Sequence, residues 1–576
     1  MLVLVSIATL MASIATLVVP ATAQAQTPSL TVNAASVRQA ISPNIYGFDY
    51  SFQGGPQDSL LTAIKAPFFR INGGDGASNY NWSAGVNSSN IGADDHFKQG
   101  YNNSPTAAQS PDLGITMGRA DSSTAQIMET IPINPYLVNS NAYNCSYPQS
   151  LYPGQDSYAL NGPTLECGSG TISGTAVPDT TLSAQYVTNT ATIQEGWATH
   201  NTSAWNTCLL GGVCFYEMDN EPGGWSNTHH DWQTTTQATY TTITSDAETY
   251  AAAIKSIEAN AKIVGPGDYQ MLYGGVVNNS PTSDPSMVYY LKTFQANDTT
   301  LGKRTLDYLD EHYQVGDASG SIQNDFDMVR SFWDPTYLYD FYGNNVFAPY
   351  HTQNVSLGLG DNIELIPRMQ AYAAAFYPGT LFSISEYELQ HYAGGGGTNP
   401  EVGNFSMVDA LVEADALGVW GYYGLGMAAI FPAPVGVVSG DSVGYTFLLY
   451  RNYDGAGSKF GDTSVTSTST NQGQLSVYGA LRSSDGKLTV MVINKENVTY
   501  TTTLTLSGFT ATGTAGTYTY SSANTSAIVA STASVSGGNT VNYSFPPFSA
   551  TEFVFTPNGS GSTSIAPPTD LLATAQ

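Results

Sequence analysis

Eight short apolar runs that end in polar residues recur along the chain, and helical or loop segments separate them. This alternation is typical of a parallel sheet or barrel, because each parallel strand needs a crossover before the next strand begins. Eight repeats predict a (β/α)8 TIM barrel of the α/β class. The runs are Ile45–Tyr50, Pro67–Asn72, Ala125–Ile131, Cys214–Asn220, Lys262–Gly267, Thr305–His312, Thr380–Glu386 and Gly418–Tyr423.

After about residue 439 the sequence changes to short alternating strands split by Gly, Asn and Ser, which predicts a C-terminal all-β sandwich. Leu30–Val37 alternates in the same way and is expected to supply that sandwich with a strand. The expected organisation is a signal peptide at 1–25, an N-terminal strand at 26–41, the catalytic barrel at 42–439, the sandwich at 440–557, and a segment at 558–576. That last segment is either a linker leading into a fibronectin type III module, whose first strand it resembles, or an ordinary tail.

The N-terminal segment indicates export. An apolar run, Leu2–Pro20, is followed by Ala23–Ala25, a small-residue cleavage pattern. No Lys or Arg precedes Arg38, so either the true start of the chain lies upstream or the segment is retained as a membrane anchor. We expect cleavage after Ala25 and a secreted protein.

The charge balance excludes several partners. Seventeen Lys and Arg against 45 Asp and Glu give a net charge of −28, which repels phosphate backbones and anionic membranes. Aromatic side chains are common, with 37 Tyr, 22 Phe and 7 Trp, and suit a neutral polyhydroxylated ligand such as a sugar. We expect a monomer that binds a polysaccharide, and neither nucleic acid nor, after signal removal, a membrane.

Two glutamates stand where two predicted strands end. Phe215–Gly224 delivers Asn220 and Glu221 to the tip of strand four, and Leu381–Tyr387 delivers Glu386 to strand seven. Glycosidases need two such carboxyl groups, and strands four and seven allow a separation of about 5–5.5 Å, which is the retaining geometry. We therefore predict that Glu221 is the acid/base and that Glu386 is the nucleophile.

Several runs resemble glycoside hydrolase family 44, whose members are retaining endoglucanases and xyloglucanases of the large (β/α)8 glycosidase clan. The runs are Asp219–His229, Asn79–Trp82, Arg330–Tyr337, Ile384–Tyr387, Tyr450–Gly455 and Phe460–Val465. The resemblance implies a barrel with a β-sandwich, cleavage of internal β-1,4-glucan bonds, no organic cofactor and a structural calcium in some members. It also implies that Asn220 holds the sugar 2-hydroxyl. Gly224, His230–Gln233 and the Cys145–Cys167 loop depart from the family pattern, which leaves the preferred glycan open.

Other candidate residues have structural alternatives. Arg70, at the tip of strand two, is expected to orient the nucleophile. The alternative is that Arg70 forms an ion pair on the surface. His312 and Tyr313 end strand six and either place the nucleophile or pack in the core. Five aromatic residues are candidates to stack on sugars, although a single aromatic side chain more often packs in the core. Trp420 is the favoured candidate. The other four are Tyr387, Trp333, Trp225 and Trp82.

The remaining predictions concern cysteines and metal. Four cysteines allow three pairings, and we expect neighbours in sequence to form the disulfides, Cys145 with Cys167 and Cys208 with Cys214. Asp454 and Asp462 lie in a Gly-rich stretch that either ligates calcium or forms a plain turn. The sequence therefore assigns no residue as a metal ligand.

These observations predict a secreted retaining endo-β-1,4-glucanase that acts on cellulose-like glucans or xyloglucan. An endo-xylanase or mannanase on the same barrel is the nearest alternative, because only the subsite contacts differ. A noncatalytic glycan-binding or adhesion protein is the alternative from another class, and the presence of both glutamates argues against it.

Overall fold

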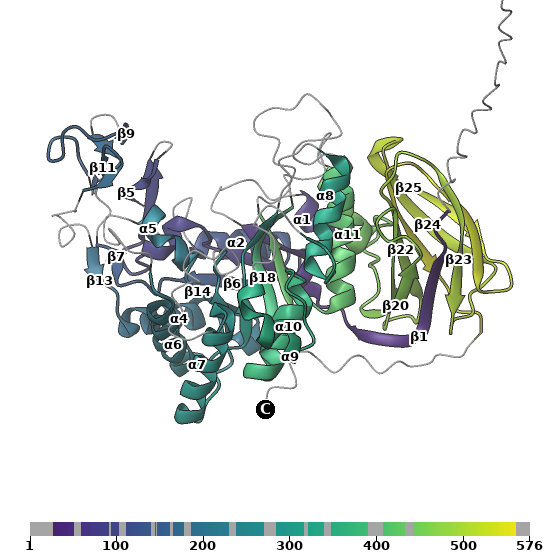
Figure 1. The fold of residues 1–576 in the computed structure, drawn as a ribbon, viewed down its shortest axis with the longest axis horizontal. Helices are drawn as coiled ribbons and strands as arrows, with labels where there is room; N and C mark the ends of the chain where they lie inside the picture. Colours follow the sequence, from purple (N-terminus) through teal and green to yellow (C-terminus); the bar gives the residue numbers. More distant parts are fainter. Residues whose placement is uncertain are drawn as a thin grey trace, which may run out of the picture.

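The structure is a computed structural model, shown as a ribbon in Figure 1. It describes residues 27–50, 59–91, 94–102, 111–139, 144–145, 147–161, 165–177, 186–229, 238–269, 284–315, 321–338, 347–389, 407–431 and 442–559. The predicted signal peptide and the segment from residue 560 onwards lie outside these described residues.

Eight parallel strands close into a barrel in chain order. Each strand pairs with the next, and the last pairs with the first, so that the sheet has no free edge. The predicted barrel is therefore confirmed. Its strands are β2 (Gly47–Tyr50), β3 (Phe68–Ile71), β6 (Gln126–Ile131), β14 (Val213–Met218), β15 (Lys262–Pro266), β16 (Tyr308–Asp310), β18 (Leu381–Leu389) and β19 (Met427–Ile430).

A helix follows each barrel strand and packs on the outside of the barrel. Threonine hydroxyls cap two of these helices, because Thr190 and Thr239 accept the backbone N–H groups of Ile193 and Thr242. The eight helices are α1 (Ser59–Ile64), α2 (Pro111–Asp121), α4 (Ala191–Trp205), α6 (Tyr240–Ile257), α7 (Ser286–Leu301), α10 (Leu365–Phe376), α11 (Met407–Tyr423) and α12 (Ser442–Asn452).

The prediction of the eighth strand at Gly418–Tyr423 is wrong. That segment forms the last turns of α11, and the eighth strand is β19, a few residues later. Residues 407–421 of α11 are all buried, so the sequence shows no polar face and no helical period. Gly424, with a φ of +73°, ends the helix and lets the chain turn into β19.

The barrel also extends beyond the predicted boundary at residue 439. Helix α12 contacts α1 and α11, so it is the last barrel helix and not part of the C-terminal sheet. The C-terminal sheet takes up the chain again at Thr463.

The C-terminal unit is one nine-stranded sheet that curls around its own core. Its strand order is β25-β24-β27-β22-β21-β20-β1-β23-β26, and the terminal strands β25 and β26 contact each other. β1 (Leu30–Ala40) pairs antiparallel with β20 and parallel with β23, so the start of the chain is built into this sheet. The other strands are β20 (Thr463–Ser469), β21 (Leu475–Leu481), β22 (Leu488–Asn494), β23 (Tyr500–Ser507), β24 (Thr514–Ser521), β25 (Asn524–Ser534), β26 (Thr540–Phe545) and β27 (Ser549–Phe555).

A buried polar contact joins the barrel to this sheet. Asp415 on α11 accepts a hydrogen bond from the Tyr478 hydroxyl at 2.8 Å and forms an ion pair with Lys495 at 2.5 Å. Gly418 faces the Tyr478 ring so closely that a Cβ atom there would overlap it. The two units are therefore packed against each other along α11.

Smaller elements lie in the loops that follow β3, β6, β14 and β16. Figure 1 shows β5, β9 and β11 at the end of the molecule away from the C-terminal sheet. Within the described residues, no helix has the length and apolar composition needed to cross a membrane. The smaller elements are β4 (Val86–Ile91), β5 (Asp94–Asn102), β7 (Tyr136–Val138), β8 (Asn144–Cys145), β9 (Tyr158–Asn161), β10 (Leu165–Gly168), β11 (Thr171–Ile172), β12 (Thr175–Ala176), β13 (Tyr186–Thr188), β17 (Tyr313–Val315), α5 (Trp225–Thr228), α8 (Ile322–Met328) and α9 (His351–Ser356).

Candidate active site

A strained turn at the end of β14 carries Glu221. Asp219 and Glu221 both have left-handed backbone conformations, with φ of +73° and +48°, which side chains other than glycine adopt at a cost. The Asp219 carboxylate holds the turn by accepting the backbone N–H of Ile133 at 2.7 Å and the hydroxyl of Ser78 at 2.5 Å. The backbone N–H of Glu221 donates to the carbonyl of Gly267 at 2.8 Å. The turn is thereby tied to the neighbouring strands.

A register shift in β18 positions Glu386. Between Ile384 and Tyr387 the pairing with β19 slips, which marks a bulge. In a regular strand, neighbouring side chains point to opposite faces. Here Ser385 and Glu386 both reach the same polar network inside the barrel.

The two predicted catalytic carboxyl groups lie close together. Glu221, His312 and Glu386 each place one side-chain atom within 4.8 Å of the others. The Glu221 side chain is 19% exposed and the Glu386 side chain is 8% exposed. This separation matches the roughly 5–5.5 Å of retaining glycosidases and is shorter than the roughly 6.5–9.5 Å of inverting ones.

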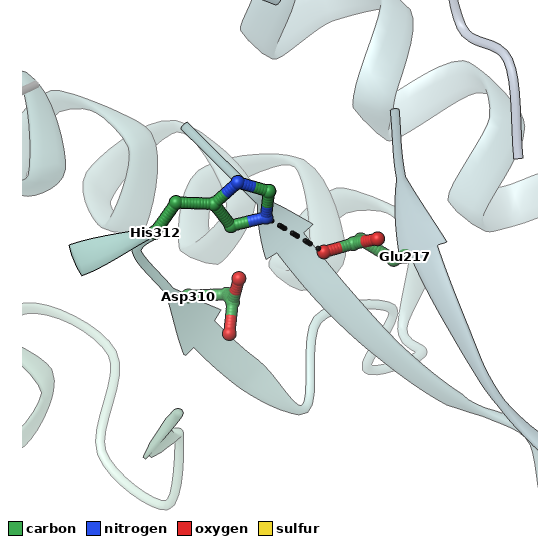
Figure 2. Close-up of side chains that lie close together, drawn as sticks. All are labelled: Glu217, Asp310 and His312. Carbon is green, nitrogen blue, oxygen red and sulfur yellow. Dashed lines mark hydrogen bonds and ion pairs between the residues drawn. The ribbon is translucent and has the colours of Figure 1, made fainter. Parts of the chain in front are cut away.

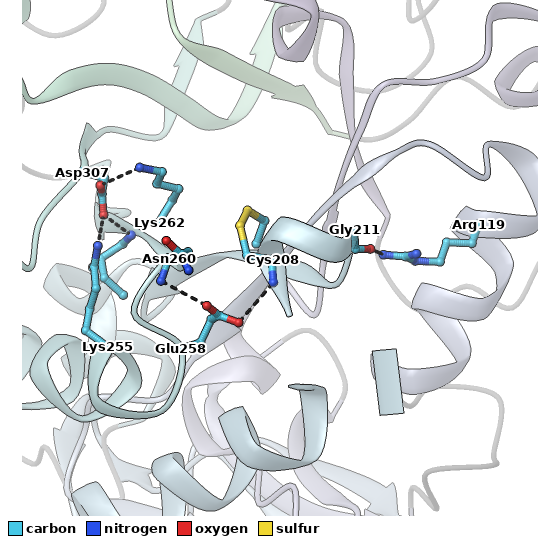
Figure 3. Close-up of a disulfide and its surroundings, with 10 residues drawn as sticks. Arg119, Cys208, Gly211, Lys255, Glu258, Asn260, Lys262 and Asp307 are labelled. Carbon is cyan, nitrogen blue, oxygen red and sulfur yellow. Dashed lines mark hydrogen bonds and ion pairs between the residues drawn. A yellow bond between two sulfur atoms is a disulfide. The ribbon is translucent and has the colours of Figure 1, made fainter. Parts of the chain in front are cut away.

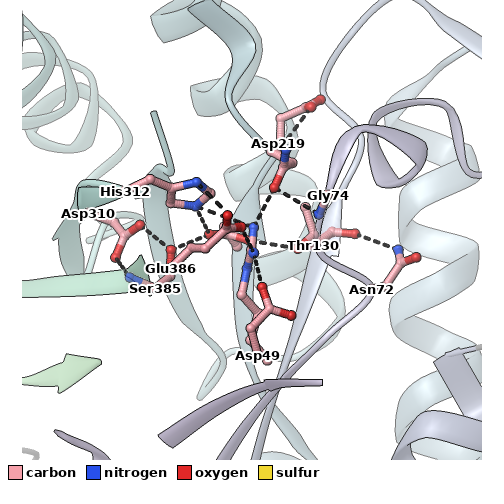
Figure 4. A network of polar contacts seen from close by, with 12 residues as sticks. Asp49, Asn72, Gly74, Thr130, Asp219, Asp310, His312, Ser385 and Glu386 are labelled. Carbon is pink, nitrogen blue, oxygen red and sulfur yellow. Dashed lines mark hydrogen bonds and ion pairs between the residues drawn. The ribbon is translucent and has the colours of Figure 1, made fainter. Parts of the chain in front are cut away.

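Arg70 is the centre of the polar network. Figure 4 labels its neighbours Asp49, His312 and Glu386. Its Nη1 donates to Glu386 at 2.6 Å and to Asp49 at 2.5 Å, and its Nε donates to Glu217 at 2.8 Å. Its Nη2 donates to the amide oxygen of Asn220 at 2.7 Å. Because the Arg70 side chain is fully buried, the alternative of a surface ion pair does not apply. The guanidinium fixes Glu386 by a charge-assisted hydrogen bond, as the sequence suggested.

His312 bridges two glutamates on opposite sides of its ring. Its Nδ1 lies 3.0 Å from Oε1 of Glu221, and its Nε2 lies 3.3 Å from Oε1 of Glu217 (Figure 2). Burial lowers the pKa of His312, but the charge of Glu386 and the hydrogen bonds to Glu217 and Glu221 outweigh burial and raise it well above its usual value. The raised pKa favours the protonated form of the ring.

The carboxyl groups of the network have different affinities for protons. Burial raises the pKa of Glu221 although His312 opposes it, so Glu221 tends to keep a proton. Burial also raises the pKa of Glu217, but Arg70 and His312 outweigh it and bring the pKa down to about 2. Burial raises the pKa of Asp49 to about 7 despite Arg70. An acid that keeps its proton thus lies close to a carboxylate held by Arg70, which is the pairing that glycosidases use.

Three of the five aromatic candidates for sugar stacking are in the core, and this corrects the prediction. Tyr313 is in the core as well, which is the packing alternative given for it. Trp420 is fully buried on α11 and packs edge-on against Tyr387, with ring centroids 4.6 Å apart. Tyr387 is buried too and donates its hydroxyl to Glu413 at 2.7 Å. Each of the four faces other side chains and has no exposed ring face for a sugar. Trp225 donates to Asp219 at 3.3 Å, and Tyr313 donates to the hydroxyl of Ser331 at 2.8 Å.

The other two tryptophans are half-buried. Trp333 stacks on Tyr423, which lies just before β19 and therefore at the N-terminal end of the barrel, opposite the glutamate pair. This position excludes Trp333 from the catalytic groove. Trp82 donates its indole N–H to the carbonyl of Ile193 at 2.7 Å and stacks on His200, with ring centroids 5.8 Å apart.

The sequence analysis missed three residues of the site. Glu217 and Asp49 contact Arg70, and the amide nitrogen of Gln314 on β17 donates to Glu386 at 3.1 Å. A signal was present for Glu217, because an acidic residue in the middle of an apolar barrel strand needs a buried cationic partner. Gln314 lies beyond the predicted sixth strand and gave no such signal.

A disulfide joins Cys208 to Cys214, as predicted, with Cα atoms 4.5 Å apart (Figure 3). It links the short turn before β14 to the strand that carries the acid/base candidate. Glu258, after α6, accepts the backbone N–H of Cys208 at 3.2 Å. The side chains of Cys145 and Cys167 lie outside the described residues.

The acidic side chains are the groups whose surroundings bear on metal binding. Asp454 accepts the backbone N–H groups of Ala456 and Ser458, as in a plain turn. Within the described part of the chain, two clusters have ligand atoms close enough for an ion, and both include His312. Calcium prefers oxygen ligands, whereas both clusters include a histidine nitrogen, so these clusters do not suit the calcium that the resemblance implies.

A closed parallel barrel with a strand-four glutamate and a strand-seven glutamate at this separation has the architecture and site geometry of a retaining glycoside hydrolase. Comparisons with known proteins agree with this class. The sequence profile of glycoside hydrolase family 44 matches residues 77–315. Endoglucanase A of Paenibacillus lautus is 27% identical over 517 residues, which is 82% of this chain and 64% of that protein.

Solved structures give the same result. CelM2, a bifunctional glucanase-xylanase protein from a metagenome library, superposes with a TM-score of 0.78 at 29% identity, over 92% of this chain and 99% of that one. A family 44 xyloglucanase from Paenibacillus polymyxa superposes with a TM-score of 0.69 at 21% identity, over 92% of this chain and 100% of that one. These matches confirm the resemblance to glycoside hydrolase family 44 that the sequence shows. The chain spans 22% and 64% of the lengths of the curated relatives that it matches.

Proposed function

We propose that this chain is a retaining endo-β-1,4-glucanase that hydrolyses internal bonds of cellulose-like glucans or xyloglucan. The observation that carries the proposal is the separation of at most 4.8 Å between atoms of Glu221 and Glu386. At this distance no water fits between the carboxyl group and the anomeric carbon, so the second carboxylate attacks directly.

In the first step, Glu221 donates its proton to the glycosidic oxygen while Glu386 attacks the anomeric carbon. The bond to the leaving sugar breaks, and a glycosyl-enzyme ester forms. In the second step, Glu221 accepts a proton from water, whose oxygen attacks the anomeric carbon and releases Glu386. The raised pKa of Glu221 supports its role as the acid. It falls when esterification removes the charge of Glu386, which prepares Glu221 to act as the base.

The residues around the pair hold these groups in place. Arg70 and Gln314 each donate to a different oxygen of Glu386, so the attacking carboxylate cannot rotate freely. Arg70 and the backbone N–H of Gly74 donate to the amide oxygen of Asn220, at 2.7 and 2.9 Å. The amide nitrogen is then the group that Asn220 offers to the sugar 2-hydroxyl.

The substrate class is supported by the relatives' names. The P. lautus relative is named an endoglucanase, and the P. polymyxa structure is of a xyloglucanase. CelM2 is described as a glucanase-xylanase, which favours xylan as the second candidate substrate. We also propose that the protein is secreted, because its N-terminal segment is apolar, and that it is a monomer. Hydrolysis needs no organic cofactor in this proposal, because the two carboxyl groups supply the acid, the base and the nucleophile.

The test is a panel of xyloglucan, carboxymethylcellulose, glucomannan and xylan, with viscosity and product size measured together. We expect a rapid fall in viscosity and a ladder of oligosaccharides from at least one of the two glucans. Glu195→Gln, at a half-buried position of α4, is the matched charge control for Glu221→Gln and Glu386→Gln, which we expect to be inactive. Hydrolysis of xylan or glucomannan alone would refute the glucan assignment, and no hydrolysis of any polymer would refute the proposal.

A further inference from the structure

A cavity of about 450 Å³ lies between the barrel and the C-terminal sheet, on the side away from the catalytic pair. Three lining residues place the cavity at the N-terminal end of the barrel. Ile41 and Pro43 precede the first barrel strand, and Arg451 lies at the end of the last barrel helix. The loops at 457–462 and 482–487 close the cavity from the sheet. Its volume is in the range of sites for sugar-sized ligands, roughly 300–1,000 Å³.

The lining of this cavity has the opposite charge to the rest of the protein. Four of the 17 Lys and Arg side chains of the chain line it, against two acidic side chains, which gives 4 − 2 = +2. The whole chain carries −28. The four cations are Arg451, Lys459, Arg482 and Lys487, and the two acids are Asp462 and Asp485.

Arg451 is a buried cation without an anionic partner among the described residues. It is 7% exposed, and its Nε has no hydrogen-bond partner. Its Nη2 donates to the backbone carbonyl of Lys65 at 3.3 Å, and its guanidinium lies 5.3 Å from the centre of the Tyr46 ring. A buried guanidinium is costly unless it is paired, so this side chain indicates a missing anion.

A second cation shares this environment. Burial lowers the pKa of Lys459, and the charges of Arg451 and Lys65 lower it further. Burial also lowers the pKa of Arg451. The positive charges therefore repel each other across the cavity, and an anion placed between them would relieve that repulsion.

The two acidic residues of the lining are already engaged. The Asp485 carboxylate accepts hydrogen bonds from Nε and Nη2 of Arg482, at 2.9 and 2.8 Å. Asp462 accepts the hydroxyl of Ser483 at 2.5 Å and its backbone N–H at 3.2 Å. Arg482 is thus neutralised within the lining, whereas Arg451 and Lys459 are not.

We propose that this cavity binds a small anionic ligand through a carboxylate or phosphate group held by Arg451 and Lys459. Such a ligand contacts the end of the barrel and the loops of the sheet at the same time, so it strengthens their junction. The site is independent of the glutamate pair, and its ligand is not the neutral polymer that the catalytic groove accepts.

The test is calorimetric titration of the full chain with inorganic phosphate, glucuronate and glucose at constant ionic strength. We expect saturable binding of phosphate, glucuronate or both, and none of glucose. Tighter binding of glucuronate identifies a sugar acid, and tighter binding of phosphate identifies a phosphate group. In Lys459→Met the affinity should fall about tenfold or more, as expected for a lost charge-assisted hydrogen bond.

Lys292→Met is the matched control, because Lys292 is an exposed lysine on α7 that pairs with Asp284. It should bind as the unmodified chain does. Arg451→Met gives a second test, and a matching melting temperature and circular dichroism spectrum show that it is folded. The absence of saturable binding to both anions, equal binding of glucose, or equal affinities in Lys459→Met and Lys292→Met would overturn the proposal.

Discussion

Replacing Glu221 with alanine gives the sharpest test of the catalytic assignment. Its carboxyl group has one hydrogen-bonded neighbour among the described side chains, His312 at 3.0 Å, so the variant should fold. A general acid/base contributes about 10²–10⁴ in rate, or about 2.7–5.4 kcal/mol at roughly 1.36 kcal/mol per factor of ten. We expect kcat on polymer to fall by this amount in Glu221→Ala.

The loss should depend on the leaving group. A cellobioside of dinitrophenol needs no proton to depart, so the glycosyl-enzyme should still form on Glu386, and its hydrolysis becomes the slow step. Azide, which needs no general base, should then restore turnover and give a β-glycosyl azide. In Glu386→Gly, azide occupies the space of the nucleophile, and the product should be the α-glycosyl azide.

Product configuration, read by nuclear magnetic resonance, decides between the possible assignments. If Glu221→Ala gives the α product and Glu386→Gly the β product, the two roles are reversed. Polymer turnover near that of Glu195→Gln in either variant would remove the corresponding residue from the mechanism. Failure of azide to rescue a folded Glu221→Ala would contradict the double-displacement reaction itself.

Three further predictions concern protons and stability. Burial raises the pKa of Glu413 to about 8 from an ordinary 4.5, so its contribution to stability is complete below pH 4.5 and is lost as the pH rises to about 8. Urea unfolding should show a decline of up to about 1.4 kcal/mol per pH unit that Glu413→Gln removes, and an unchanged slope would contradict this. Loss of the disulfide in Cys208→Ser/Cys214→Ser should lower the free energy of unfolding by about 2 kcal/mol, as a short closed loop predicts, and an unchanged urea midpoint would refute this. In Asp49→Asn an amide replaces a carboxyl group whose pKa is about 7. The variant should keep the kcat/KM of the unmodified chain at acidic pH, and its pH profile should lack the inflection near pH 7. A loss of activity that is equal at every pH would contradict this prediction.

The sequence predicted that Glu221 and Glu386 lie close together, because the information for this is local. Apolar residues followed by Asn220-Glu221, or by Glu386, mark the C-terminal tip of a barrel strand in both cases. Chain order then places the two tips on strands four and seven, and closure of the barrel brings them together. Arg70 could be inferred in the same way, because it also lies near the C-terminal tip of a predicted barrel strand, the second one.

The errors arose where tertiary burial removed the sequence pattern. α11 is surrounded by the barrel, α12 and the C-terminal sheet, so its apolar residues cover all sides, and its last turns look like a strand. Trp420 was therefore placed on a strand at the mouth of the barrel. It lies on a core helix. The bulge in β18 depends on pairing with β19, which no local pattern encodes.

The charge balance of the network explains why Glu217 is part of the site. Arg70 and His312 supply two positive charges, whereas Asp49, Glu217 and Glu386 supply three negative charges when all are ionised. Glu217 keeps its charge, since its pKa is about 2, and Asp49 is the group that takes up a proton near pH 7. The hydrogen bond to Glu217 therefore helps to raise the pKa of His312, and Arg70 holds Glu386 close to Glu221, whose pKa burial raises.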